Sequence, residues 1–371
     1  MNKDISDDEK VKRIALKMIP MVGDVVAKSL TSYFGSATSI FKSKASLLQK
    51  IPGIGNVTAT NIAAFKNFEL AEKELAFITK HNIETYFFTE DNYPFRLKQL
   101  ADSPYLFYFR GKADLNHTKI ISVVGTRAAT DYGKRFCNEL IEALAPHQVM
   151  VVSGLAYGID ITAHKAAIKN KLPTIGVLAH GLDRLYPSSH KSVAINMIEH
   201  GGVLSEYRSG TPPDRENFPE RNRIVAGMSD AVIVVEAAIK GGALITAEYG
   251  NSYNKDVFAL PGRNTDEFSA GCNKLIKTNK AALITSADDL IYIMGWEQHK
   301  KSKKSKQATL LLNLTPLEQL IIDQLTLHER IHIDLLTHQC KTPNSELALI
   351  LLNLEFNGIV KSLPGNYYMR T

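Results

Sequence analysis

Four glycine-containing segments of the sequence combine small residues in a way that suits an anion, and two of them also carry a cation. They are Gly125-Thr126-Arg127, the segment 153–160 with Ser153, Gly154 and Gly158, the segment 180–183, and Lys240-Gly241-Gly242. Small residues let a ligand approach the backbone, and a helix that begins there directs its N–H groups at negative charge. Arg127 and Lys240 add fixed positive charge. One such turn can serve chain geometry alone, but four of them, two with cations, predict an anion-binding site.

A second segment, 216–223, carries an aromatic ring between charged residues. It contains Phe218, Arg221, Asn222 and Arg223. Arginine guanidinium groups fit phosphate oxygens, and a phenylalanine face can stack on an unpaired base. The alternative is a salt-bridged loop in which Glu216 and Glu220 neutralise the arginines and the ring lies in the core. The segment taken alone leaves both interpretations open.

Motifs of other chemistries are absent or poorly placed. The turn after the first predicted strand lacks G-x-G-x-x-G, no phosphate-binding P-loop occurs, and Val151 replaces the first glycine of a serine-hydrolase elbow at Ser153. The segment 328–332 matches H-E-x-x-H, but a zinc site needs both histidines on one helix turn and a third ligand. Coincidence is favoured, with His338 and Cys340 as the minor metal alternative. We predict no metal, no cofactor and no catalytic residue.

The turns follow short apolar runs that are typical of buried strands. These runs span 119–124, 148–152, 173–178, 231–235 and 256–260. Residues with helical spacing lie between the first two runs. Strands alternating with helices predict a parallel sheet covered on both faces, and ligands of such sheets bind beyond the carboxyl ends of the strands. The four turns are therefore expected at one edge.

Composition divides the chain into four parts, predicted as a helical domain over 1–84, an α/β domain over 85–297, a Lys/Ser linker over 298–309 and a winged helix over 310–371. In the first part, 51–55 and its weaker echo 19–23 resemble helix-hairpin-helix turns, which either bind nucleic-acid phosphates or merely join packed helices. The linker is predicted as a spacer rather than a tether that scans DNA. The last part has a net charge of −2, which favours protein contacts over DNA recognition.

The whole chain has 371 residues, 44% of them hydrophobic and 22% charged, which is typical of a globular protein. Five lysines between 300 and 306 supply most of its net charge of +6. A polar start, three widely spaced cysteines and the lack of a long apolar run predict a cytoplasmic protein without a membrane partner.

Eight motifs occur in a fixed order: GTRAATDYG, VVSGLAYGID, LAHGLDRLYP, LSEY, ENFPERNRIVAGMSD, GALITAEYG, ALPG and GCNKLIK. Over about 85–291 they resemble the DNA-processing protein A (DprA/Smf) family. The resemblance implies an extended Rossmann-like sheet that binds single-stranded DNA, flanked by a sterile-alpha-motif-like domain and a winged helix. It also implies a homodimer that loads RecA recombinase onto strands covered by single-strand-binding protein during natural transformation and recombination, with no catalytic activity.

The resemblance also assigns residues. The implied DNA-binding set is Gly125, Thr126, Arg127, Ser153, Gly154, Gly158, Phe218, Arg221, Asn222, Arg223, Lys240, Gly241, Gly242 and Lys277. The implied dimer and recombinase surface contains Asn273, Leu275, Ile276, Leu283 and Ile284. The segment 279–281 is one residue longer than the family pattern, which puts the register of that surface in doubt.

The leading alternative is a Rossmann-like enzyme that releases the base from a nucleoside monophosphate. Such enzymes carry P-G-G-x-G-T-x-x-E, and the corresponding segment 240–248 retains its Glu248 but lacks the proline, the third glycine and the threonine. A carboxylate without its phosphate cradle is a poor general acid–base candidate, so DNA binding is favoured.

Overall fold

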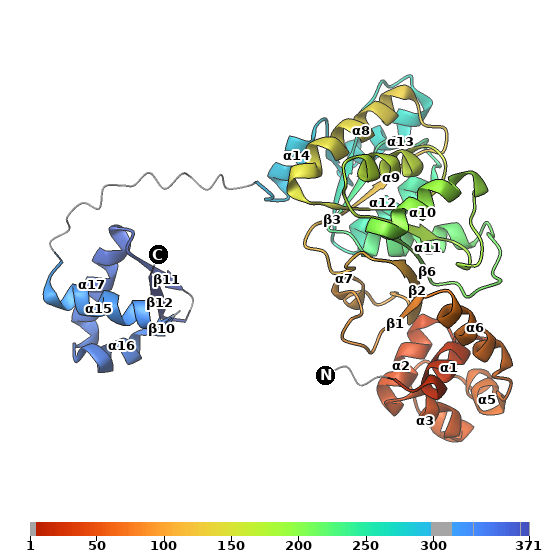
Figure 1. The fold of residues 1–371 in the computed structure, drawn as a ribbon, viewed down its shortest axis with the longest axis horizontal. Helices are drawn as coiled ribbons and strands as arrows, with labels where there is room; N and C mark the ends of the chain where they lie inside the picture. Colours follow the sequence, from red (N-terminus) through yellow and green to blue (C-terminus); the bar gives the residue numbers. More distant parts are fainter. Residues whose placement is uncertain (1–4, 298–313, 329, 364, 371) are drawn as a thin grey trace. The chain divides into compact units, whose positions relative to one another are not determined.

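The computed structural model describes residues 5–297, 314–328, 330–363 and 365–370. The chain forms two compact units, Met1–Glu297 and Gln298–Thr371 (Figure 1), and each is described by itself. The predicted linker at 298–309 lies outside the described residues.

The first unit begins with a bundle of short helices. These are α1 (Asp7–Leu16), α2 (Asp24–Phe34), α3 (Ala37–Lys42), α4 (Ala45–Leu48), α5 (Asn56–Ala64) and α6 (Glu69–Lys80). The turns before α2 and α5 have the same geometry, because Met21 at φ 69° occupies the left-handed conformation that Gly53 adopts at φ 84°. Gly23 and Gly55 then cap the two helices. The weak internal repeat is therefore a real structural repeat, although Met21 bears the strain that glycine avoids.

The centre of the first unit is a nine-stranded sheet with the order β1-β2-β6-β5-β4-β3-β7-β8-β9. Its strands are β1 (Glu84–Phe87), β2 (Leu106–Gly111), β3 (Ile120–Val124), β4 (Met150–Ser153), β5 (Thr174–Leu178), β6 (Gly202–Ser205), β7 (Ala231–Val234), β8 (Asp256–Ala259) and β9 (Ala282–Leu283). Strands β6 to β9 in this order pair in parallel, whereas β1–β2 and β2–β6 pair antiparallel. The predicted parallel α/β sheet is confirmed, and the antiparallel edge is an addition to it.

Helices cover both faces of this sheet, because alternate strand residues enter two different cores. Ile121 and Val123 pack with α8 (Asp131–Leu144), α9 (Ile159–Lys169) and α14 (Ala287–Ile293). Ile120 and Val124 pack with α11 (Asn217–Gly227), α12 (Gly242–Ser252) and α13 (Ala270–Lys277). The remaining α7 (Phe95–Lys98) and α10 (Lys191–His200) pack near the antiparallel edge. Three short 3-10 turns complete the unit: η1 (Ala145–His147) contacts α8, η2 (Ser188–His190) contacts α10 and η3 (Glu267–Ser269) contacts α13.

The second unit has the winged-helix arrangement predicted from its sequence. It contains α15 (Pro316–Leu327), α16 (Ile333–Cys340), α17 (Asn344–Phe356) and a small sheet of β10 (Ile331–His332), β12 (Tyr367–Arg370) and β11 (Val360–Leu363). His328 has an extended backbone after α15 and His332 lies in β10, so the two histidines of H-E-x-x-H do not share a helix turn. Across the described ranges, no group of three or more metal-binding side chains gathers.

No helix in the described part of the chain is both long and apolar enough to cross a membrane. Cys137, Cys272 and Cys340 are all buried and unbridged.

Candidate functional site

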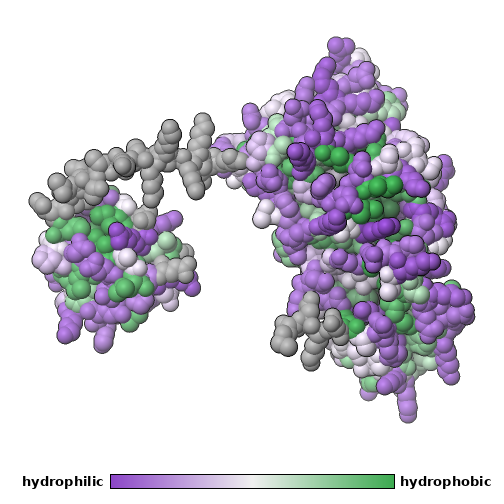
Figure 2. Space-filling view, viewed as in Figure 1, coloured by the Kyte–Doolittle hydropathy of each residue, from purple (hydrophilic) through white to green (hydrophobic). Residues whose placement is uncertain are grey.

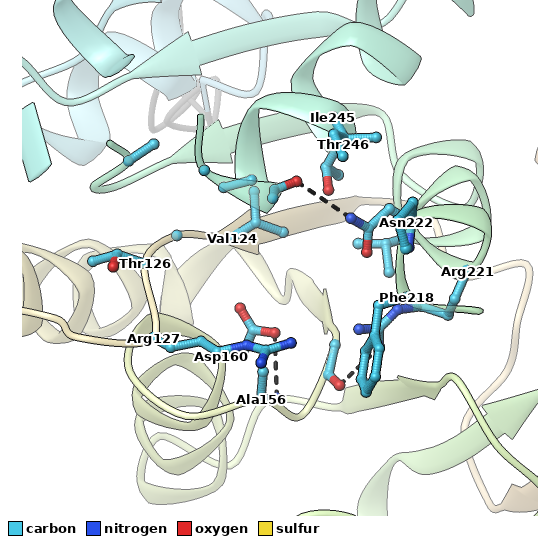
Figure 3. Close-up of a pocket in the computed structure, with 18 of the residues that line it drawn as sticks. Val124, Thr126, Arg127, Ala156, Asp160, Phe218, Arg221, Asn222, Ile245 and Thr246 are labelled. Atoms are coloured by element: carbon cyan, nitrogen blue, oxygen red, sulfur yellow. Dashed lines mark hydrogen bonds between the residues drawn. The ribbon is translucent and has the colours of Figure 1, made fainter. Parts of the chain in front are cut away.

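The carboxyl ends of the parallel strands open into a cleft of about 350 Å³ between α11 and the start of α12 (Figure 3). The structure brings many of the predicted residues to this cleft. Its lining includes Gly125, Thr126, Arg127, Gly154, Phe218, Arg221, Asn222, Gly241 and Gly242. Three of the four turns expected at one sheet edge thus meet Phe218, Arg221 and Asn222 around one cavity, whereas no residue of the 180–183 turn lines it.

The loop after β3 presents Arg127 to the cleft. Its guanidinium carbon lies 5.2 Å from the centre of the Phe218 ring, and the side chain is exposed. Among the described residues, no carboxylate forms an ion pair with Arg127. A cation above an aromatic face, with no competing anion, is available to a negatively charged ligand.

A buried carboxylate fixes the shape of this loop. Glu236, at the end of β7, accepts hydrogen bonds from the Thr130 N–H at 2.9 Å and the Thr130 hydroxyl at 2.5 Å. The Glu236 carbonyl also accepts the Thr126 N–H at 2.7 Å. The sequence reasoning missed Glu236. An acid directly after an apolar strand is a signal that could have found it, because a buried carboxylate requires hydrogen-bond partners and so orders the residues that supply them.

The second glycine turn locks against the first. Gly158 has φ 76°, and a Cβ placed there would meet the backbone of Thr126 and Arg127. The following Ile159 N–H donates to the Thr126 carbonyl at 3.2 Å. Only glycine allows this approach, so Gly158 serves by positioning the Arg127 loop and the start of α9.

Arg221 and Asp160 form the floor of the cleft. The Arg221 guanidinium is buried and donates hydrogen bonds to the carbonyls of Gly154, at 2.7 Å, and Val177, while its Nε has no partner among the described residues. Burial lowers the pKa of Arg221 to about 10, which still leaves the guanidinium charged at neutral pH. Burial raises the pKa of Asp160, and Arg221 opposes that rise. Arg221 is therefore a buried cation beneath the ligand space rather than a free arm.

The N-terminus of α12 forms the opposite wall. Gly241 caps this helix without a side-chain hydrogen bond to the first turn, and a Cβ placed at Gly242 would have no atom within 4 Å. Asn222 donates to the Gly242 carbonyl at 3.3 Å and so ties α11 to this turn. An open helix N-terminus in the same cleft as Arg127 favours an anion. Lys240 is exposed just before it.

Three residues of the predicted set point elsewhere. Ser153 is fully buried and its hydroxyl donates to the Val123 carbonyl at 2.6 Å. Lys277 lies at the far end of α13 from the cleft. The near end is marked by Gly271, whose N–H donates to the carbonyl of Ala237, a cleft residue. Arg223 lies in a separate cavity between the N-terminal helices and the sheet.

The Arg223 cluster consists of Arg223, Glu206, Asp24 and Lys17. Arg223 Nη2 pairs with Glu206 and, at 3.1 Å, with Asp24, whose other oxygen pairs with Lys17 Nζ at 2.5 Å. The expected neutralising partners, Glu216 and Glu220, are not the ones used. Burial raises the pKa of Glu206 to about 7, and Arg223 opposes that rise. Arg223 thus holds α11 to the N-terminal helices.

The predicted dimer residues divide by burial. Leu275 and Ile284 lie in the cores of this chain, and Ile276 packs against the first of these cores. Asn273 uses its side chain to bind the Gly262 backbone. Leu283 is 49% exposed on the edge strand β9. Sequence reasoning missed two further exposed apolar side chains of the same region of the chain, Tyr292 and Ile293 on α14. Leu283 is therefore the member of the set with a free apolar side chain.

Glu248, the candidate of the hydrolase alternative, is exposed on α12 and lies 4.0 Å from Lys280. It is absent from the cleft lining, where Asp160 is the sole carboxylate among the described lining residues. The site therefore lacks a general acid–base group in the place that this alternative requires.

The fold defines an α/β protein with a cleft at the carboxyl edge of its sheet, followed by a winged helix. Family models agree: DNA recombination-mediator protein A matches residues 84–295, the DprA winged helix domain matches 305–366, and a helix-hairpin-helix motif matches 15–73. The chain belongs to the DNA recombination-mediator protein A (DprA/Smf) family.

Relatives and solved structures support this assignment. Protein Smf of Synechocystis sp. is 35% identical over 298 residues, covering 78% of this chain and 74% of its own length. DNA processing protein DprA of Bacillus subtilis is 37% identical, covering 67% and 86%. The structure of DprA from Streptococcus pneumoniae aligns with a TM-score of 0.66 at 32% identity, covering 78% of this chain and 97% of that one. A Helicobacter pylori DNA processing protein A, solved to show its single-stranded DNA binding mode, aligns at 0.53 and 30% identity, covering 58% and 97%.

Proposed function

We propose that this protein binds single-stranded DNA in the cleft at the carboxyl edge of its sheet. The observation that carries the proposal is the exposed Arg127 facing Phe218 beside the open N-terminus of α12. A phosphate would lie against the first N–H groups of α12 and the Arg127 guanidinium, and a base would stack on the half-buried Phe218 ring. The single-stranded DNA binding described for the Helicobacter pylori relative supports this assignment.

The chemistry of the cleft favours strands of any sequence. Its lining combines glycines, two arginines and the start of α12, groups that suit phosphates, and Thr126, Asn222 and Thr246 are the uncharged polar side chains among the described lining residues. Duplex DNA keeps its bases stacked inside, so it cannot use the Phe218 face. Binding should therefore be salt-sensitive, tolerant of sequence and selective for single strands.

The finer role follows from family membership and is part of the same proposal. The bound strand is passed to RecA recombinase in the cytoplasm during natural transformation and recombination, with single-strand-binding protein as a further partner. Two copies associate through the β9 edge, where Leu283 is 49% exposed. The exposed α17 side chains Leu349 and Phe356, at 63% and 82%, support a protein-contact role for the winged helix.

We further propose that the protein acts by binding and not by catalysis. The cleft carboxylate, Asp160, is buried beside Arg221, whereas Glu248 lies outside the cleft. A group that is to shuttle protons at a substrate must reach it, which neither arrangement provides.

The decisive experiment is a gel shift with matched single- and double-stranded oligonucleotides at several salt concentrations. Selective, salt-sensitive binding of the single strand is expected, and equal affinity for both forms would overturn the proposal. Incubation with nucleoside monophosphates tests the enzyme alternative, because release of free base would favour it.

A further inference from the structure

Another hollow, here named the α10 groove, lies apart from the DNA cleft and from the cavity that holds Arg223. It has a volume of about 350 Å³ and is bounded by α10, the loop 182–188 and the strands β2, β5 and β6. None of its lining residues also lines the DNA cleft. It therefore needs an explanation of its own.

The floor and one rim of the α10 groove are apolar. Leu182, Leu185 and Ile198 are half-buried in it, and Ile195 on the outer face of α10 is 54% exposed. Figure 2 shows hydrophobic surface over the part of the first unit where Figure 1 places α10. Apolar side chains gathered around a hollow are typical of a contact site, whereas scattered ones are ordinary.

Cations surround this floor. Arg110 from β2 and Lys191 from the start of α10 are both exposed, and no carboxylate in the described ranges lies within ion-pair distance of either. The single acid of the groove, Asp183, pairs with Arg184 at 2.9 Å and accepts the Gly210 N–H at 2.9 Å. The groove therefore has two uncompensated positive charges beside an apolar floor.

We propose that the α10 groove docks an acidic peptide segment of a partner protein, with bulky apolar side chains among its acids. Leucine or phenylalanine side chains of the segment would cover Leu182, Leu185 and Ile195, and its carboxylates would face Arg110 and Lys191. Charge complementarity selects this occupant. A second copy of this chain in a two-fold contact would instead oppose these cations to their own equivalents. Nucleic acid would meet the cations but find no aromatic face in the lining on which to stack.

The proposal goes beyond the DNA-binding function and can be tested without DNA. The probe is a short fluorescein-labelled peptide of aspartates that ends in leucine and phenylalanine, titrated with the full-length protein at fixed low salt. Fluorescence anisotropy should show saturable binding. Replacing the aspartates by asparagine, or the two apolar residues by serine, should each abolish it.

Variants of the protein locate the binding. Lys191→Glu should weaken the peptide by about tenfold, a change of ~1.4 kcal/mol, and a lysine version of the peptide should regain part of the loss. Ile195→Ser should weaken it by a similar factor. Lys165→Glu is the matched control, because Lys165 is also an exposed lysine but lies on α9 outside the groove. The affinity of this variant for the peptide should stay within about twofold of the unchanged protein.

Three outcomes would overturn the proposal. The first is that the peptide does not bind even at millimolar protein. The second is that Lys165→Glu and Lys191→Glu lose peptide affinity equally. The third is that Lys191→Glu loses affinity for single-stranded DNA while no variant binds the peptide, which would assign the groove to DNA. Circular dichroism of each variant shows that it is folded, so a loss of binding reports on the groove.

Discussion

Replacing Arg127 by alanine should weaken single-stranded DNA of every sequence by a similar factor. The side chain is exposed and contributes one charge-assisted contact to a phosphate, about 1.5–3 kcal/mol, plus ~0.5–1 kcal/mol from its place over the ring of Phe218. Since these terms overlap, a loss of about 2–3 kcal/mol, or roughly 30- to 150-fold in Kd, is expected. The slope of log affinity against log salt should fall by about 0.7, the value for one phosphate of a single strand.

The assay is fluorescence anisotropy of labelled oligonucleotides of different sequence across a salt series. Lys165→Ala is the matched control, because this exposed lysine on α9 does not line the cleft. The free energy of unfolding of Arg127→Ala should change by less than about 0.5 kcal/mol, since the side chain makes no ion pair with any described residue. An unchanged Kd and salt slope in the Arg127 variant would refute the assignment of the cleft.

Three further outcomes are expected. Leu283→Asp should convert dimers to folded monomers in light scattering. Ile284→Asp should instead unfold the chain, because Ile284 is buried in the core. The same outcome for both variants would contradict an interface at β9. Burial raises the pKa of Glu206 to about 7, so the folded protein holds the Glu206 proton more tightly than the unfolded chain does. The free energy of unfolding should therefore fall as the pH rises from about 5 to 7.5. Denaturant titrations of Glu206→Gln should show a smaller fall over the same range. A chain ending at Trp296 retains the first compact unit except for its last residue, Glu297, and should lose at most about tenfold in single-strand affinity, the nonspecific share of the lysines that follow. A larger loss in a folded truncation would make the winged helix the part that binds DNA.

The sequence was sufficient to predict the strands that build the site. Apolar runs followed by turn residues marked β3, β4, β5, β7 and β8 to within a residue or two, because parallel strands buried on both faces are nearly continuous hydrophobic segments. The strands β1, β2 and β6 escaped notice. They form the antiparallel edge, where pairing depends on partners far away in the chain.

Side-chain direction was the harder part of the site. Arg221 and Arg223 were both assigned to one pocket, yet they lie on α11, where two positions apart means a rotation of about 200°. Arg221 accordingly enters the cleft floor, whereas Arg223 meets Glu206 and Asp24 on the other side of the helix. The opposite directions of the two arginines could have been predicted from the sequence if this segment had been assigned to a helix. The partners of Arg223, Glu206 and Asp24, could not have been predicted, because they depend on how elements distant in the chain pack together.

The Arg223 cluster has a consequence for how this chain can be divided. Deleting the N-terminal helices would remove Asp24 and Lys17, so Arg223 would lose one of its two carboxylate partners and keep only Glu206. The helix bearing that arginine also carries Phe218 and Asn222, which line the cleft. The N-terminal helices, through Asp24 on α2, therefore help to hold α11 in position. A partner that displaces these helices, or a truncation that removes them, would therefore shift α11 and change the position of Phe218 and Asn222 in the cleft without contacting the bound strand.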